Sequence, residues 1–216
     1  MDRETFLSRV GRASLTSVLP EAPRLPPWRT EDEADHSGLF RARAQAAHAV
    51  LHGPVSRHGV PRVVTAIATG HDASSFVAWD HLPAPGVAAG LMSSGLERVD
   101  HEVPWEGRLE HNMAQFGVDL GVTGADAGLA ESGSLVLTHG EGRPRMASLI
   151  PEVHVALLET SSIVRTLAHW ARNNPRLASE TTNLVIVTGP SRTGDIEQQL
   201  NLGVHGPRHV HIVMIR

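Results

Sequence analysis

Three glycine-rich segments carry the side chains whose types and spacing best suit chemistry. They are residues 121–134 (GVTGADAGLAESGS), 189–197 (GPSRTGDIE) and 203–208 (GVHGPR). Each adjoins an apolar run that is typical of a buried strand. Ligands gather at the carboxyl ends of strands in open α/β sheets, so we expect the three segments to meet in one shared concave site.

In the first segment, Glu131 is flanked by small residues and lies directly before the Ser132-Gly133 turn. A carboxylate in that place can act as a nucleophile or as a general base. The structural alternative is that Glu131 accepts backbone N–H groups at this turn, and that Asp126 caps a short helix. The binding candidates of this segment are Thr123, Ser132, Gly133 and Ser134.

In the second segment, Arg192 offers a planar fork of donors for a carboxylate or a phosphate. The alternative is an ion pair between Arg192 and Asp195 or Glu197, two acids that suit the first turn of a helix capped by Thr193. The binding candidates of this segment are Ser191, Arg192, Thr193 and Asp195.

In the third segment, His205 lies between glycines in a tight loop and can move protons near neutral pH. Its alternative is a structural role, in which it bonds loop carbonyls. Gly206 and Arg208 complete the candidates, and Arg208 suits either an anion or the solvated surface. His209 and His211 share a strand face, but no further ligand follows at metal-binding spacing, so no intrinsic metal is expected.

Missing residue types exclude whole classes of function. The 216 residues include no Cys and no Lys, which removes thiolate nucleophiles, Schiff-base chemistry and Cys-held iron–sulfur clusters from this chain. The net charge of −4 gives no sign of a nucleic-acid surface. No apolar run approaches the roughly 20 residues of a membrane span, and the first residues do not resemble a signal peptide. We therefore expect a cytoplasmic protein.

The elements that must position these residues point to two regions. A helix over 2–18 and a proline-rich connector form an arm at 1–29, and residues 30–216 form one α/β domain. We expect strands near 62–69, 75–79, 118–123, 134–138, 153–158, 184–188 and 209–215. We expect helices from the Thr30/Glu33 capping box to Gly53, at 86–96 and 112–116, after Asp126, from Ser161 or Ser162 to Pro175, and from Thr193. Strands without polar alternation favour a mostly parallel sheet with helices on both faces.

Two stretches of this chain resemble the LUD family. They are 121–155, which begins GVTGADAGLAESG, and 189–215, in which SRTGDIE precedes GVHGPR. The resemblance implies an α/β fold like that of the sugar-isomerase and CoA-transferase group. It also implies a role in oxidising L-lactate to pyruvate within a three-protein system whose partner proteins carry iron–sulfur clusters. This chain would then need no cofactor of its own.

Three functional hypotheses follow. In the first, the chain is an accessory component of that system, and loops with Glu131, Arg192, His205 and Arg208 bind a small carboxylate or a partner. An Arg would hold the carboxylate, and His205 would accept the hydroxyl proton. In the second, Glu131, which resembles the nucleophilic glutamate of CoA transferases, serves a stand-alone acyl or CoA transferase or a sugar-phosphate isomerase. In the third, the chain is a non-catalytic regulatory or scaffold protein.

Overall fold

The computed structural model describes residues 4–5, 7–9, 35–100, 117–176, 181–194, 200–203 and 205–216. The chain divides into two compact units, Met1–Ala34 and Asp35–Arg216, and the sheets belong to the second. The predicted connector at 20–28, the Thr30/Glu33 capping box and the helix at 112–116 lie outside the described residues. Within the described residues, no helix is long and apolar enough to cross a membrane.

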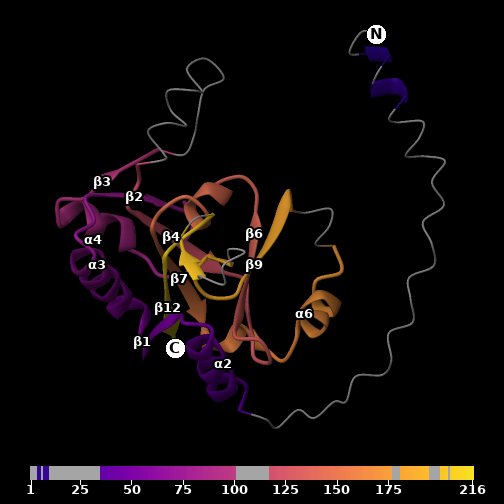
Figure 1. The fold of residues 1–216 in the computed structure, drawn as a ribbon, viewed down its shortest axis with the longest axis horizontal. Coiled ribbons are helices and arrows are strands. Elements are labelled where there is room, and N and C mark those ends of the chain that lie inside the picture. The colour runs from indigo at the N-terminus through magenta and orange to yellow at the C-terminus, as the bar shows by residue number, and fades with distance from the viewer. Residues whose placement is uncertain are drawn as a thin grey trace. The chain divides into compact units, whose positions relative to one another are not determined.

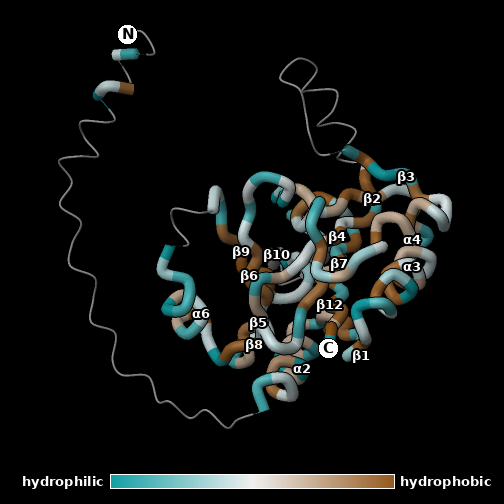
Figure 2. Tube along the Cα trace, turned by 180° about the vertical axis from the view of Figure 1, so that it is seen from behind, coloured by the Kyte–Doolittle hydropathy of each residue, from teal (hydrophilic) through white to brown (hydrophobic). Residues whose placement is uncertain are grey.

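A six-stranded parallel sheet forms the centre of the unit, with strand order β1-β12-β7-β4-β2-β3 (Figure 1). Its strands are β1 (Val50–Val55), β2 (Ser75–Ala78), β3 (Glu97–Arg98), β4 (Leu120–Ala125), β7 (Val153–Glu159) and β12 (His209–Ile215). Hydrophobic residues run along the central strands (Figure 2). Both faces of these strands are buried, which explains why their sequences show no polar alternation.

Helices cover both faces of this sheet. On one face, α3 (Val60–Gly70) and α4 (Val87–Ser93) pack against alternate residues of β2, β4 and β7. On the other face lie α2 (His36–Ala46) and a smaller sheet of order β8-β5-β6-β9. Helix α6 (Leu167–Asn173) packs through Trp170 on the far side of the smaller sheet. The predicted fold class, an α/β fold with a mostly parallel sheet between helices, is therefore confirmed.

The smaller sheet consists of β5 (Ala127–Leu129), β6 (Ser134–His139), β8 (Ile163–Val164) and β9 (Asn183–Val187). Strands β10 (Arg192–Gly194) and β11 (Leu200–Leu202) form a separate antiparallel pair. Three single-turn helices complete the described elements: η1 (Arg57–Gly59), η2 (Arg145–Ser148) and η3 (Thr160–Ser162).

Most of the predicted strands and the helix near 86–96 are confirmed, but the predictions for the region 47–70 are wrong. Helix α2 ends at Ala46 rather than at Gly53, and residues 50–55 form the edge strand β1, which pairs with β12. The predicted strand at 62–69 is helix α3. Pro61 stands in its first turn, where the missing N–H costs nothing, and its buried residues recur at helical spacing. The β-branched side chains in this stretch favour a strand only as a local preference, which this packing outweighs.

Three further helix predictions are wrong in whole or in part. The chain after Asp126 forms β5, which makes a hairpin with β6. Helix α6 begins after its cap Thr166 rather than at Ser161 or Ser162, which belong to η3. The segment after Gly189 holds the strands β10 and β11 where a helix capped by Thr193 was expected. In each case tertiary contacts outweigh a local capping signal.

Candidate functional site

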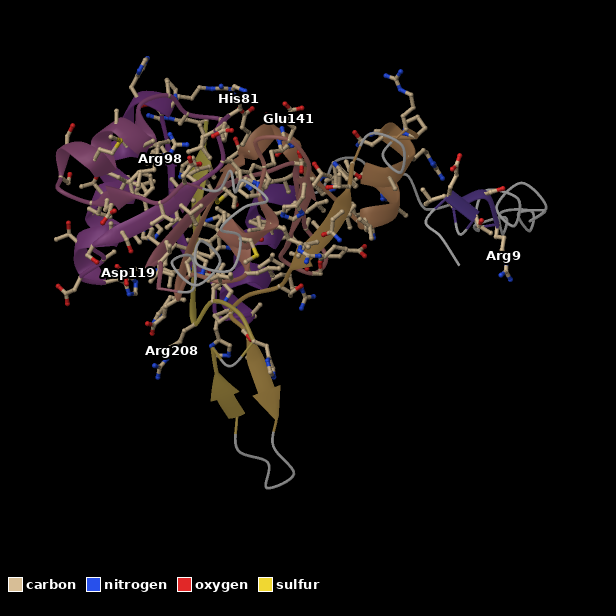
Figure 3. The ribbon with its side chains drawn as sticks, turned by 90° about the horizontal axis from the view of Figure 1, so that it is seen from above. Arg9, His81, Arg98, Asp119, Glu141 and Arg208 are labelled. Carbon is tan, nitrogen blue, oxygen red and sulfur yellow. The ribbon has the colours of Figure 1, made fainter. Side chains whose placement is uncertain are left out.

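The parallel sheet has two chemically distinct edges. His81 follows the carboxyl end of β2 in this sheet and Glu141 follows β6 of the smaller sheet, whereas Asp119 and Arg208 directly precede the first residues of β4 and β12. Figure 3 shows the first pair on the opposite side of the unit from the second pair, and the β10–β11 pair extends on the side of Arg208. Groups at one edge therefore cannot share a small ligand with groups at the other.

A cavity of about 310 Å³ lies at the carboxyl edge, where open α/β sheets bind their ligands. We call it the carboxyl-edge cavity. It is lined by one arginine and by residues at or just beyond the carboxyl ends of β2, β4 and β7: Trp79, His81, Leu82, Pro83, Gly124, Ala125, Asp126, Arg143, Glu159 and Ser162. Of these residues, Gly124, Ala125 and Asp126 belong to the first glycine-rich segment singled out from the sequence.

Arg143 is held over this cavity by two neighbours. Its Nη1 donates to Oδ1 of Asp126 at 2.9 Å and to Oγ1 of Thr138 at 3.2 Å. The other oxygen of Asp126 accepts the backbone N–H and the hydroxyl of Thr138, at 2.7 and 2.8 Å. Asp126 thus anchors the arginine to strand β6 instead of capping a helix. Among the described residues, these bonds use only Nη1, which leaves Nε and Nη2 for a ligand.

Trp79 forms the wall beneath the arginine. The guanidinium carbon of Arg143 lies 5.1 Å from the centroid of the indole ring, and the buried indole N–H donates to the carbonyl of Pro144. Gly124 lies beside this ring, and a Cβ there would make an ordinary contact of 3.5 Å with it and a tighter one of 3.3 Å with Cδ of Pro83. A flat cation stacked on an aromatic ring keeps a fixed orientation, which favours two-point binding of a planar anion such as a carboxylate.

The far side of the carboxyl-edge cavity carries a second ion pair. Glu159 lies at the end of β7, and its carboxylate accepts a bond from Nη2 of Arg57. Nη1 of Arg57 donates to the carbonyl of Pro83 at 3.0 Å. The cavity therefore has paired charges on both sides, and Arg143 retains unused donors within the described residues.

The amino edge has its own hollow, of about 310 Å³, lined by Gly203, Gly206 and Arg208 together with residues that begin β4 and β7. Asp119 is firmly bonded here: its Oδ2 accepts the backbone N–H and the hydroxyl of both Ser74 and Ser75. Burial alone would raise the pKa of Asp119, but these four bonds outweigh it and lower the pKa below the usual range.

The predicted residues of the first segment serve local contacts. Oε1 of the half-exposed Glu131 accepts a bond from Nε of Arg165 at 2.7 Å. The hydroxyl of Ser134 lies 2.8 Å from that of Ser132 and 2.7 Å from that of Thr188. Gly133 has a positive φ of 69°, and a side chain there would overlap the backbone of α2 at Ala44. This glycine is therefore required for packing, whatever its neighbours do.

The second and third segments meet each other. The N–H of Ser191 donates to the carbonyl of Pro207 at 2.9 Å, and Gly206 lies against the Ser191 side chain. Nη2 of Arg192 donates to the carbonyl of Ala47, just beyond α2, at 2.6 Å.

His205 is exposed, and Arg208 lies 3.7 Å from the carboxylate of Glu152. Thr193 belongs to β10, with its side chain outside the described residues, and Asp195 lies outside them altogether.

In the described part of the chain, some of the predicted residues contact one another or neighbouring segments, and the others contact residues outside the predicted set. Ser191 and Gly206 touch, and Ser134 meets Thr188, the residue before the second segment. The contacts of Glu131, Arg192 and Arg208 described above go to other residues, and none of them joins one of these side chains to another or to His205. A catalytic or binding role for these residues stays a prediction.

Thr123 is fully buried, and its hydroxyl lies 2.9 Å from Nε2 of His154 in the neighbouring strand β7. Burial, with smaller effects of the His139 and His211 imidazoles, lowers the pKa of His154 to about 4. This pair is therefore neutral at physiological pH and belongs to the interior.

The fold and the carboxyl-edge cavity define an α/β protein with an arginine held over a cavity at the carboxyl edge of a parallel sheet. The sequence matches the LUD domain family over residues 40–215, and the chain belongs to this family. It is 30% identical to lactate utilization protein C of Halalkalibacterium halodurans, over 98% of this chain and 97% of that protein. It is 27% identical to lactate utilization protein C of a Geobacillus species, over 98% and 93%.

A solved structure supports the fold. The crystal structure of a DUF162 family protein from Deinococcus radiodurans superimposes with a TM-score of 0.63, covering 84% of this chain and 96% of that chain. The two sequences are 21% identical, so this likeness bears on the fold alone.

Proposed function

We propose that this chain acts in lactate utilisation, as an accessory component that binds a small carboxylate and works with iron–sulfur proteins. The observation that carries the proposal is similarity to lactate utilization protein C over nearly the whole length of both chains. The absence of Cys fits such a division of labour, because this chain alone cannot hold a Cys-ligated cluster.

The carboxyl-edge cavity is the proposed binding site for the carboxylate. Arg143 would bind it with Nε and Nη2, the two-point arrangement that gives guanidinium groups their preference for planar anions. Asp126 holds the arginine in place, and Trp79 shields one of its faces from water. The same cavity would exclude a larger anion, because Glu159 lies on its other side.

Oxidation of lactate to pyruvate removes two electrons and two protons from the substrate. His81 lines the same cavity, and we assign it as the acceptor of the hydroxyl proton. The electrons, with the remaining hydrogen, would pass to a redox centre on a partner protein. Arg192, His205 and Arg208 are all exposed, and with Glu131 they are the candidate contacts to that partner.

A reconstituted system with the iron–sulfur partners tests this proposal. We expect lactate-dependent electron transfer to require this chain, and the chain to co-purify with the partners. Arg143→Gln should weaken lactate binding about tenfold or more, since it removes a charge-assisted pair of bonds. Arg172→Gln is the matched control, because Arg172 is exposed on α6. Equal electron transfer with and without the chain would refute the assignment.

A further inference from the structure

Four histidines gather at the amino end of β12, on the sheet face that α3 covers. His209 and His211 lie on one face of β12, His52 comes from the edge strand β1, and His71 is the C-cap of α3. The ring centroid of His71 lies 4.7 Å from that of His209 and 5.0 Å from that of His211, and those of His52 and His211 are 5.3 Å apart. None of these residues lines the carboxyl-edge cavity.

Two close nitrogen pairs connect three of the rings. Nε2 of His52 lies 3.0 Å from Nδ1 of His211, and Nε2 of His71 lies 2.9 Å from Nε2 of His211. Each pair needs one shared proton. When Nδ1–H of His211 donates to His52, the lone pair on Nε2 of His211 points toward Nε2 of His71. A hydrogen bond to the second ring nitrogen, which fixes the tautomer, is a common feature of metal-binding histidines.

We propose that Nε2 of His71 and Nε2 of His211 bind one divalent transition-metal cation of the Zn²⁺ class. His209 becomes the third ligand after its ring rotates, and His52 is the positioning residue that sets the tautomer of His211. Among the described residues, no group of three or more His, Asp or Glu is already arranged to hold a metal. The rotation of His209 is therefore part of the proposal.

The distances suit this arrangement. Two nitrogens bound at about 2.1 Å to one cation lie about 3.0 to 3.4 Å apart, for bond angles from octahedral to tetrahedral. The 2.9 Å between the two Nε2 atoms needs to widen by only a few tenths of an ångström. The cation would displace the proton that the pair now shares, and because it lies off the line between the two nitrogens, both rings would also tilt.

The four histidines have charged residues of both signs nearby and an opening to solvent. Glu152 acts on His209 with a favourable negative charge, while Arg208 opposes it and is itself 3.7 Å from Glu152. Arg62 lines the adjoining hollow, of about 430 Å³, which also reaches His52, His71 and His211. This opening lets a cation enter and lets solvent complete its coordination.

Calorimetric titration of the untagged, chelator-treated full-length chain with Zn²⁺ at pH 7.5 tests the site. We expect one Zn²⁺ per chain with a micromolar or tighter Kd, and at least a tenfold loss in His71→Ala and in His209→Ala. His58→Ala is the control, because His58 is exposed in η1 and outside the group of four. Circular dichroism would establish that each variant is folded.

Copper supplies an independent readout of the ligands. The electron paramagnetic resonance spectrum of the Cu²⁺-loaded chain should show coupling to three imidazole nitrogens, and to two in His209→Ala. His52→Leu should keep all three nitrogens but weaken Zn²⁺ binding several-fold. Absence of Zn²⁺ binding at 100 μM would overturn the proposal, and so would equal losses in His58→Ala and His71→Ala, which would indicate scattered histidines.

Discussion

Acidification should destabilise this protein through His154, and His154→Gln should remove that effect. A solvated histidine has a pKa of 6.5, and burial lowers the pKa of His154 in the folded chain to about 4. Between these values the unfolded chain binds more protons than the folded chain, so stability falls as pH falls. The stability that neutral His154 contributes is fully present above the pKa of His154 in the unfolded chain, and it is lost as pH drops through the pKa of His154 in the folded chain.

The magnitude follows from the shift. Each pKa unit corresponds to about 1.4 kcal/mol, so His154 alone should cost about 2 kcal/mol between pH 7 and pH 5, and about 3 kcal/mol by pH 4. Glutamine does not titrate and can still bond the hydroxyl of Thr123, which lies 2.9 Å from Nε2 of His154. The variant should therefore lose its stability more gradually with pH, whatever its absolute stability at pH 7.

Urea unfolding at pH 7, 6 and 5 measures this difference directly. His211 also has a lowered pKa, but it is present in both proteins and cancels from the comparison. His58→Gln serves as the control, because its imidazole is exposed. If the unfolding free energies of His154→Gln and the original chain fall in parallel with pH, the reasoning about desolvation is wrong.

Three further outcomes are expected. Asp119→Asn should lower the free energy of unfolding at pH 7 by about 1 to 3 kcal/mol. The difference between the variant and the original chain, measured by urea unfolding, should vanish as pH falls through the lowered pKa of Asp119. Gly133→Ala should lower the free energy of unfolding by at least about 2 kcal/mol more than Gly95→Ala does. Both glycines have a positive φ, but only at Gly133 would a side chain meet a neighbouring backbone. Equal losses in the two variants would contradict this. If the transferase alternative holds, acyl-CoA should transfer its CoA to Glu131 as a thioester, with release of the free carboxylic acid. Mass spectrometry would detect this thioester, and Glu131→Gln would abolish it; otherwise none forms.

The sequence predicted the inner strands of the central sheet because they are buried. β4, β7 and β12 each coincide with a continuous apolar run whose residues are buried on both faces. It failed where short elements depend on distant partners. The edge strand β1 is stabilised by its register with β12, and β5 by its pairing with β8 as well as with β6, and the pairings with β12 and β8 leave no local signal.

The candidate site shows the same division. The sequence singles out Arg192 and Arg208 as candidate arginines, whereas the arginine over the carboxyl-edge cavity is Arg143. It could not indicate that Asp126 anchors Arg143, because that contact depends on the β5–β6 hairpin. Trp79 gave no signal beyond ending a strand, since its partners Arg143 and Pro144 are more than sixty positions away.

Strand direction also explains why the third glycine-rich segment, residues 203–208, lies apart from the carboxyl-edge cavity. In a parallel sheet, a segment that follows a strand and a segment that precedes one lie at opposite edges. Residues 203–208 precede β12, so Arg208 lies at the amino edge, whereas Arg143 faces the carboxyl-edge cavity. A small carboxylate bound by Arg143 and a partner bound through Arg208 would therefore occupy separate surfaces. Variants at these two arginines should then affect substrate binding and partner affinity independently.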